Sequence, residues 1–383
     1  MKRIVICFDG TRNDPSDAAQ NLDDEGEIED DGISNVLKLY FLLGGRLANL
    51  NKLHHDPNNA AEVSTFPDQP CFYFQGVGTY GSRFQRVFNS MVAPEELDVS
   101  KIIRWGAEAL RASYQQGDQV FLFGFSRGAA IARRFAKVIR DSDDSDIRVD
   151  GIGEGSVRLL SVFDTVSSFG VPNLIPKIKP RSDVLFEEGN RVHATVSEAI
   201  HLVSLDERRL AFRPTLMAPE DRVTEVWFPG VHSDVGGGYF RDALSNITLR
   251  YLLDEIGRRE LGLRFRDATD VVETEFADDE FGLDANDLNI QPGHLGELHW
   301  QRRILDLLLR DRDVLACKSG DVAEYVVSQE PMIHHTALDR IRDKRDYKPS
   351  GIKSGTPFRK VAEDGSPSDA TRFHLGRIQS GEY

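Results

Sequence analysis

Short apolar runs recur along the first 230 residues, and turn-forming residues such as Asp, Gly and Thr follow them. Runs of this length between turns are typical of strands buried in a sheet. Stretches with helical spacing of apolar residues separate several of the runs. We predict strands at 2–8, 71–74, 157–163 and 223–228, a strand, tight turn and helix within 118–138, and helices at 34–43, 98–116, 192–203, 247–253 and 300–309.

Strands that alternate with helices indicate a parallel sheet. We therefore predict an α/β fold with a mostly parallel sheet flanked by helices, loop insertions and a helical C-terminal extension; the motifs described below make it α/β-hydrolase-like. The length of 383 residues suits one large domain with insertions or two domains of ordinary size. We predict a catalytic domain at 1–258 and a mostly helical extension at 259–383 that packs on it or wraps it.

The stretch 118–138 has the pattern of a nucleophile elbow, in which a serine occupies a sharp turn between a strand and a helix. Gly124 and Gly128 lack the Cβ atoms that would collide where the strand folds back on the helix. Ser126 at the apex is therefore expected to be strained and exposed, as a nucleophile requires.

An activated serine needs a base within hydrogen-bond reach and a third group that fixes the tautomer of that base. His232 lies in a glycine-rich loop after a predicted strand, and Asp164 ends the strand that follows the elbow helix. We predict Ser126, Asp164 and His232 as the catalytic triad, because α/β-hydrolases have this chain order. Asp206 and Asp234 are rivals for the acid, although Asp234, two residues from His232, is better placed to support the loop.

Two loops are predicted to supply the oxyanion hole, which binds the negative oxygen of an acyl-transfer intermediate. The amide of Arg127 begins the elbow helix. Gly10 and Thr11 follow the first strand, where the turn leaves their amides free. Asp9 ends that strand and is assigned a supporting role.

Charge narrows the range of partners. Lys and Arg number 47 against 62 Asp and Glu, and the net charge of −15 argues against a nucleic-acid-binding surface. Residues 14–31 hold nine acidic residues and no basic one, which indicates a solvated loop without the spacing of an EF-hand. Residues 166–181 hold three prolines and three cations, which suit either a proline-stiffened connection or a lid that touches anionic headgroups.

Cysteine and histidine spacing indicates no metal site and no cofactor. Cys7, Cys71 and Cys317 are too far apart for a zinc motif or a disulfide framework, and Glu198-x-x-His201 lacks the preceding histidine of a zincin. No apolar run reaches the roughly 20 residues that span a bilayer, and the first run is too short for a signal-peptide core. We expect a chain that is cytoplasmic as synthesised and is exported, if at all, without a cleaved signal.

Taken together, the motifs resemble the α/β-hydrolase domain of type VI secretion lipase effectors. They occur in the right order across about residues 4–240. They are Phe8-Asp9-Gly10-Thr11-x-Asn13, Gly76-Val77-Gly78-Thr79, Gly124-Phe125-Ser126-Arg127-Gly128-Ala129, Phe163-Asp164-Thr165-Val166, Ser204-Leu205-Asp206-Glu207-Arg208-Arg209 and Trp227-Phe228-Pro229-Gly230-Val231-His232-Ser233-Asp234 with the glycines that follow.

This resemblance implies a serine esterase that acts on glycerophospholipids as a phospholipase A, with Ser126, Asp164 and His232 as nucleophile, acid and base. For members that are effectors it also implies delivery into a rival cell, and hence a partner in the secretion machinery or an immunity protein.

The sequence leaves three alternative functions to consider. An esterase on soluble esters would use the same triad. A catalytically silent interaction protein could keep the fold, although all three triad positions carry competent residues. The strand that ends at Asp9 is similar to that of aspartate-based phosphatases, but their chemistry needs an aspartate where this chain has Cys7.

Overall fold

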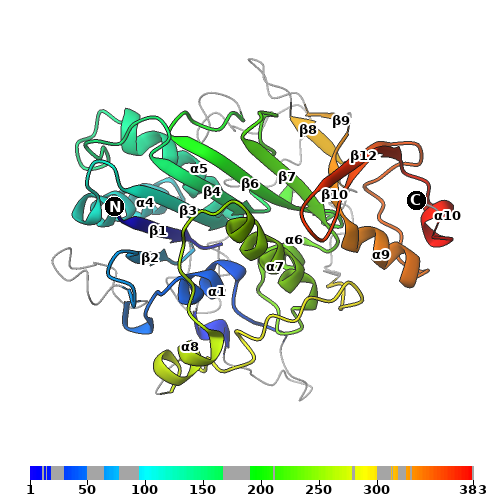
Figure 1. Cartoon of the computed structure of the whole chain (residues 1–383), viewed down its shortest axis with the longest axis horizontal. Coiled ribbons are helices and arrows are strands. Elements are labelled where there is room, and N and C mark those ends of the chain that lie inside the picture. The colour runs from blue at the N-terminus through cyan, green and yellow to red at the C-terminus, as the bar shows by residue number, and fades with distance from the viewer. Residues whose placement is uncertain are drawn as a thin grey trace.

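A nine-stranded sheet runs through the protein (Figure 1). Neighbouring strands are parallel, except that β11 and β12 are antiparallel. The predicted α/β-hydrolase-like fold is therefore confirmed. In spatial order the strands are β12 (Pro367–Arg372), β11 (Pro357–Val361), β10 (Met332–His334), β7 (Val223–Phe228), β6 (Val196–Ser204), β4 (Val157–Phe163), β3 (Gln119–Phe125), β1 (Arg3–Phe8) and β2 (Cys71–Phe74).

This computed structural model describes residues 1–10, 13, 15–18, 30–49, 64–76, 95–166, 190–209, 212–277, 281–299, 312, 314–317, 325–327 and 330–381. A separate antiparallel pair consists of β8 (Leu315–Cys317) and β9 (Tyr325–Val327). The helices are α1 (Asn35–Leu42), α4 (Glu95–Ser113), α5 (Ser126–Asp141), α6 (His232–Gly236), α7 (Ala243–Arg258), α8 (Ala268–Glu275), α9 (His335–Asp343) and α10 (Leu375–Gln379), with short 3-10 turns at Pro15–Ala18 and Leu47–Asn49.

Helices cover both faces of the sheet because alternate residues of its strands are apolar on opposite faces. On one face, Val5 and Cys7 of β1 belong to a buried cluster with α1 and α7. On the other face, Ile4 and Ile6 pack in a cluster with α4 and α5. Figure 1 shows α1, α7 and α8 on one side of the sheet and α4 and α5 on the other.

The predicted strand at 157–163 and the strand at 223–228 match β4 and β7, and the helix after Ser34 is α1. Ser34 caps that helix because its Oγ accepts a hydrogen bond from Leu37 N at 3.1 Å. The helix predicted at 192–203 is wrong, because most of this segment belongs to β6. That strand is paired on both edges, with β4 and β7, and its residues lie in buried clusters on both faces, so its apolar residues need not alternate with polar ones.

The C-terminal part differs from the mostly helical extension predicted at 259–383. Among its described residues, α8, α9 and α10 alternate with strands, and β10 extends the sheet by pairing with β7. Residues 300–309, predicted as a helix, lie outside the described part, and the boundary at 258 stays a prediction. No helix in the described ranges is long and apolar enough to cross a bilayer.

Candidate active site

The three residues predicted as a triad follow three strands of the sheet. Ser126 comes directly after β3 and Asp164 directly after β4, and the last residues of these two strands, Phe125 and Phe163, are register partners. His232 begins α6, four residues after β7 ends. Because the strands are parallel, all three side chains belong to the carboxyl edge of the sheet.

The elbow around Ser126 is strained, as its glycines predict, but Ser126 is buried and not exposed as the sequence predicted. Ser126 has a φ of 56°, in the left-handed region that side chains other than glycine seldom adopt. A Cβ on Gly128 would lie 2.2 Å from the carbonyl oxygen of Phe8, and a Cβ on Gly124 would lie 2.7 Å from Cα of Ala129. Glycine at both positions therefore lets α5 pack directly against β1 and β3.

A hydrogen bond of 2.6 Å joins Nδ1 of His232 to Oδ2 of Asp164. The His232 ring packs against the ring of Phe125, with 4.7 Å between centroids, so the histidine lies beside the residue that precedes Ser126. Nε2 of His232 is buried and has no hydrogen-bond partner among the described residues. With Nδ1 protonated toward the carboxylate, Nε2 carries the lone pair that a general base needs.

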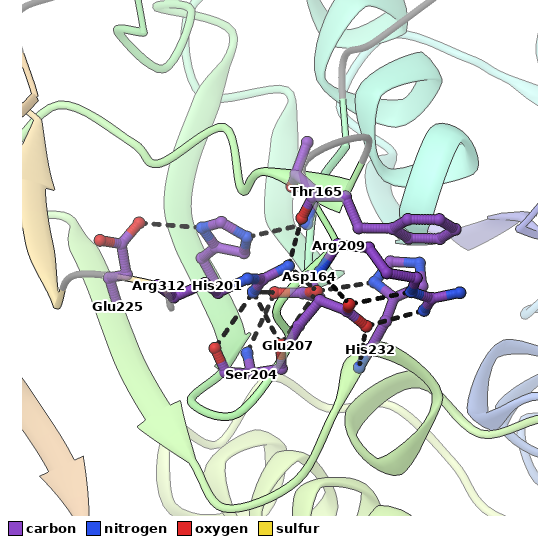
Figure 2. Close-up of polar contacts among 10 residues, drawn as sticks. Asp164, Thr165, His201, Ser204, Glu207, Arg209, Glu225, His232 and Arg312 are labelled. Atoms are coloured by element: carbon purple, nitrogen blue, oxygen red, sulfur yellow. Dashed lines mark hydrogen bonds and ion pairs between the residues drawn. The ribbon is translucent and has the colours of Figure 1, made fainter. Parts of the chain in front are cut away.

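Asp164 is fully buried and its carboxylate is surrounded by donors (Figure 2). Its φ of 38° is also in the left-handed region. Oδ1 accepts from Ser204 N at 3.0 Å and from Arg312 Nη1 at 2.6 Å. Oδ2, which binds His232, also accepts from Arg312 Nη2 at 2.9 Å and from Ser204 Oγ at 3.3 Å.

Arg312 is a site residue that the sequence did not predict. It lies 148 positions after Asp164, and no local motif points to it. Burial alone would raise the pKa of the Asp164 carboxyl, but Arg312 and His232 hold this pKa well below its usual range. Asp164 is therefore an anion at neutral pH.

Burial lowers the pKa of His232 below its usual value, although Asp164 acts in the opposite direction. Two further charges face this histidine from the loop after β6. Glu207 accepts a hydrogen bond from His232 N at 3.2 Å and pairs with Arg209 at 2.7 Å. The Arg209 guanidinium in turn lies 3.6 Å from the ring centroid of Phe212, whose edge contacts the His232 ring. The imidazole is thus held neutral among fixed neighbours.

The backbone beside Asp164 has its own support. Thr165 N donates to Nε2 of His201 at 3.1 Å, and Nδ1 of His201 bonds to Glu225 at 2.8 Å (Figure 2). Val166 N donates to the carbonyl of Ser126 at 3.2 Å, so the turn after β4 is joined to the elbow. These bonds hold the two strained residues relative to each other.

The first loop differs from its prediction in one respect. The amide of Gly10 was predicted to be free, but it donates to Oδ1 of Asp9 at 2.6 Å. Asp9 is buried and also accepts from Ser34 Oγ at 2.5 Å and Tyr73 OH at 2.6 Å. A turn need not leave its amides free, because the aspartate that ends the strand can bind the next amide itself. Burial raises the pKa of Asp9 to about 6. Thr11 lies outside the described residues.

The two rival acids have other partners. Asp206 accepts from Gly230 N, in the loop that leads to His232, at 2.8 Å and from Tyr347 OH at 2.7 Å. Asp234 accepts from Val231 N at 2.9 Å and from Nδ1 of His299 at 2.5 Å. Both carboxylates therefore bind the backbone of the loop from which His232 projects.

A parallel sheet with a strained serine elbow, an aspartate and a histidine at one edge defines the α/β-hydrolase class. The family model of the type VI secretion system (T6SS) phospholipase effector Tle1-like catalytic domain matches residues 2–142 and 149–255. The chain belongs to this family, as the motifs predicted.

Individual relatives are distant. An uncharacterized protein of Saccharomyces cerevisiae is 25% identical over 276 residues, which are 59% of this chain and 34% of the yeast protein. The crystal structure of an uncharacterized protein from Pseudomonas aeruginosa is 18% identical, with a TM-score of 0.42, over 76% of this chain and 49% of that one. The structure of a Tle1 effector bound to the VgrG spike is 21% identical, with a TM-score of 0.34, over 62% of this chain and 51% of the effector. The chain thus spans about a third of the yeast relative and about half of these two solved chains.

Proposed function

We propose that this protein is a serine hydrolase that cleaves acyl esters of glycerophospholipids, with Ser126 as nucleophile, His232 as base and Asp164 as acid. The observation that carries the proposal is the 2.6 Å bond between His232 Nδ1 and Asp164, formed beside a strained serine elbow. A neutral, buried imidazole with a partner-free Nε2 among the described residues supports its role as the proton acceptor.

In the first step the Ser126 oxygen attacks the ester carbonyl carbon, and its proton passes to Nε2 of His232. The tetrahedral intermediate then expels the alcohol, which takes that proton as the ester C–O bond breaks. Water attacks the acyl-enzyme by the same route, and the fatty acid leaves as Ser126 regains its proton. Asp164 stays ionised throughout and stabilises the imidazolium that forms in each half-reaction.

One oxyanion donor is the amide of Arg127, in the first turn of α5, where the helix dipole favours negative charge. The second donor is the amide of Thr11. Gly10 is no longer assigned to this role, because its amide is engaged by Asp9.

Family membership supports a phospholipid substrate, since the matching family is one of phospholipase effectors. The solved Tle1 effector is bound to a VgrG spike, and we extend a secretion-machinery partner of that kind to this chain. Residues 166–181 are proposed to touch the membrane surface, and of these the structure describes Val166 alone.

The test is labelling of the purified protein by a fluorophosphonate probe, together with fatty-acid release from phosphatidylcholine and phosphatidylglycerol vesicles. We expect the unchanged protein to label and to release fatty acid, and Ser126→Ala and His232→Ala to lose at least about a thousand-fold in rate. Ser156→Ala and His193→Ala are matched controls, because both residues precede the amino ends of strands, away from the carboxyl edge.

Other results would favour the alternatives. Labelling without fatty-acid release, combined with turnover of p-nitrophenyl butyrate, would indicate an esterase on soluble esters. Failure of the unchanged protein to label would overturn the serine mechanism and favour a hydrolase-shaped interaction protein.

A further inference from the structure

Arg312 binds both carboxylate oxygens of the proposed acid. Its Nη1 donates to Asp164 Oδ1 at 2.6 Å and to Ser204 Oγ at 2.7 Å, and its Nη2 donates to Asp164 Oδ2 at 2.9 Å. Nη2 also donates to the carbonyl oxygen of Phe212, whose ring contacts His232. The two parallel bonds to one carboxylate fix its rotation, which a single bond would not do.

The segment that carries Arg312 is itself anchored to the C-terminal part of the chain. Val314 N donates to the carbonyl of Gly351 at 3.1 Å, and Val314 is buried in a cluster with Tyr347 and Ile352. A Cβ on Gly351 would lie 2.4 Å from the carbonyl oxygen of Arg312, so the two backbones are in direct contact. Arg312, with only 6% of its surface exposed, thus joins this packed region to the carboxyl edge of the sheet.

Arg312 and His232 share one oxygen. Oδ2 of Asp164 accepts from His232 Nδ1 at 2.6 Å and from Arg312 Nη2 at 2.9 Å. When His232 takes the proton of the nucleophile, two cations compete for the same carboxylate. Like charges at this separation disfavour protonation of the imidazole, so the guanidinium lowers the basicity of the ring while holding its partner in place.

We propose that Arg312 is a positioning residue of the reaction, which orients Asp164 against His232 and sets the basicity of that histidine by sharing its carboxylate. This inference rests on the proposed serine hydrolase function and adds a residue from outside the segments matched by the family model. The other charges that face His232 are Asp164 after β4 and Glu207 and Arg209 after β6, whereas Asp234 on its own helix binds Val231 N and His299.

The experiment compares the pH profile of kcat/KM for p-nitrophenyl butyrate in the unchanged protein and in Arg312→Gln. We expect the plateau to fall about 10- to 100-fold, because Asp164 loses its orientation. We also expect a shift in the acid limb of the profile, the pH range in which activity falls as His232 becomes protonated. This limb should move to higher pH by about one unit, because an Asp164 carboxylate that is not shared with Arg312 stabilises the imidazolium more strongly. A purely structural role would lower the plateau without moving the limb.

Two further variants complete the test. Arg312→Lys keeps the charge but cannot bind both oxygens as a fork, so its acid limb should stay while its plateau falls several-fold. Arg340→Gln is the matched control: Arg340 is also a buried arginine, but it donates to the carbonyls of His294 and Gly296. It should lower the melting temperature and leave the acid limb in place.

A double-mutant cycle with Asp164→Asn tests the route of action. If Arg312 acts through Asp164, Arg312→Gln should lower the rate of the Asp164→Asn variant only slightly, because the carboxylate is already gone. Losses that multiply in the double variant would overturn the inference.

An unmoved acid limb in folded Arg312→Gln would also overturn it. If that variant does not fold, Arg312→Lys decides, and an unchanged plateau there rejects the inference. Failure of the unchanged protein to react with fluorophosphonate would instead reject the proposed function, and this inference with it.

Discussion

Two histidines at helix α6 differ in charge at neutral pH, because one is neutral and the other is a cation. His232, which begins the helix, has a pKa below its usual value. His299 binds Asp234 of the same helix at 2.5 Å and Asp30 at 2.8 Å, and it stacks on Tyr239 with 3.9 Å between centroids. Burial would lower the pKa of His299, but the two carboxylates raise it to about 9.

The two pKa values differ because the rings contact different numbers of carboxylates and because different cations bind those carboxylates. His232 has one carboxylate as a side-chain partner, and Arg312 binds both oxygens of it. His299 has two carboxylates, and the cation near them, Arg241 at 3.6 Å from Asp30, is more than half exposed and screened by water. A neutral imidazole can accept a proton, whereas one that is already protonated at neutral pH cannot act as a base there. Proximity to an aspartate therefore does not by itself identify a catalytic histidine.

Asp164→Asn compared with Asp234→Asn gives the largest expected contrast. The first change should lower kcat about ten-thousand-fold, because an amide no longer fixes the tautomer of His232 or stabilises its charged form. The second should change kcat by less than about ten-fold but lower the melting temperature, because Asp234 supports the loop and His299. Ester turnover and thermal melts at pH 7 measure both effects. Similar losses of turnover in the two variants would contradict the assignment of Asp164.

His299 should make stability depend on pH in the alkaline range. Its pKa in the folded protein, about 9, exceeds the value near 6.5 in an unfolded chain. The stabilisation is therefore complete below about pH 6.5 and is lost as pH rises through about 9. The difference between the two pKa values corresponds to about 3 kcal/mol, and screening by water at this partly exposed site reduces it to about 2 kcal/mol.

Thermal melts between pH 6 and pH 10 test this. The unchanged protein should lose several degrees of melting temperature relative to its His299→Gln variant, which lacks the titrating group. His335→Gln is a suitable control, because His335 pairs with a single carboxylate within its own helix. Parallel pH curves for the unchanged protein and His299→Gln would disprove the charge assigned to His299.

The sequence predicted those parts of the fold that depend on residues close together in the chain. Strands β4 and β7 have the predicted limits, because short runs rich in apolar and β-branched residues between turns are a local signal for a strand. The elbow was also predictable, because its two glycines are required by contacts closer than any Cβ allows. Segment β6 was misread because a strand covered on both faces loses the alternation that distinguishes it from a helix.

The residues that set charge in the site could not be predicted in this way. Arg312 reaches Asp164 across 148 positions, and His299 reaches Asp234 across 65. Such contacts depend on how the chain folds back on itself, and a lone arginine or histidine has no local signature. The Gly10 amide shows the same limit at short range, because the rotamer of Asp9 decides where that amide donates.

Glu207→Gln should produce the smallest effect and the one most specific to His232. The Glu207 carboxylate accepts from His232 N at 3.2 Å and favours the imidazolium, while its partner Arg209 disfavours it. Removing the negative charge leaves the Arg209 cation uncompensated, so the pKa of His232 should fall and the acid limb of kcat/KM should move to lower pH by a few tenths of a unit. This shift is opposite in sign to that expected for Arg312→Gln, because one change removes an anion and the other a cation. Glu198→Gln, at an ion pair with Arg158 and Arg259, should leave the limb unmoved. Shifts of the same sign in the Glu207 and Arg312 variants would mean that general loosening of the site, rather than charge, determines the basicity of His232.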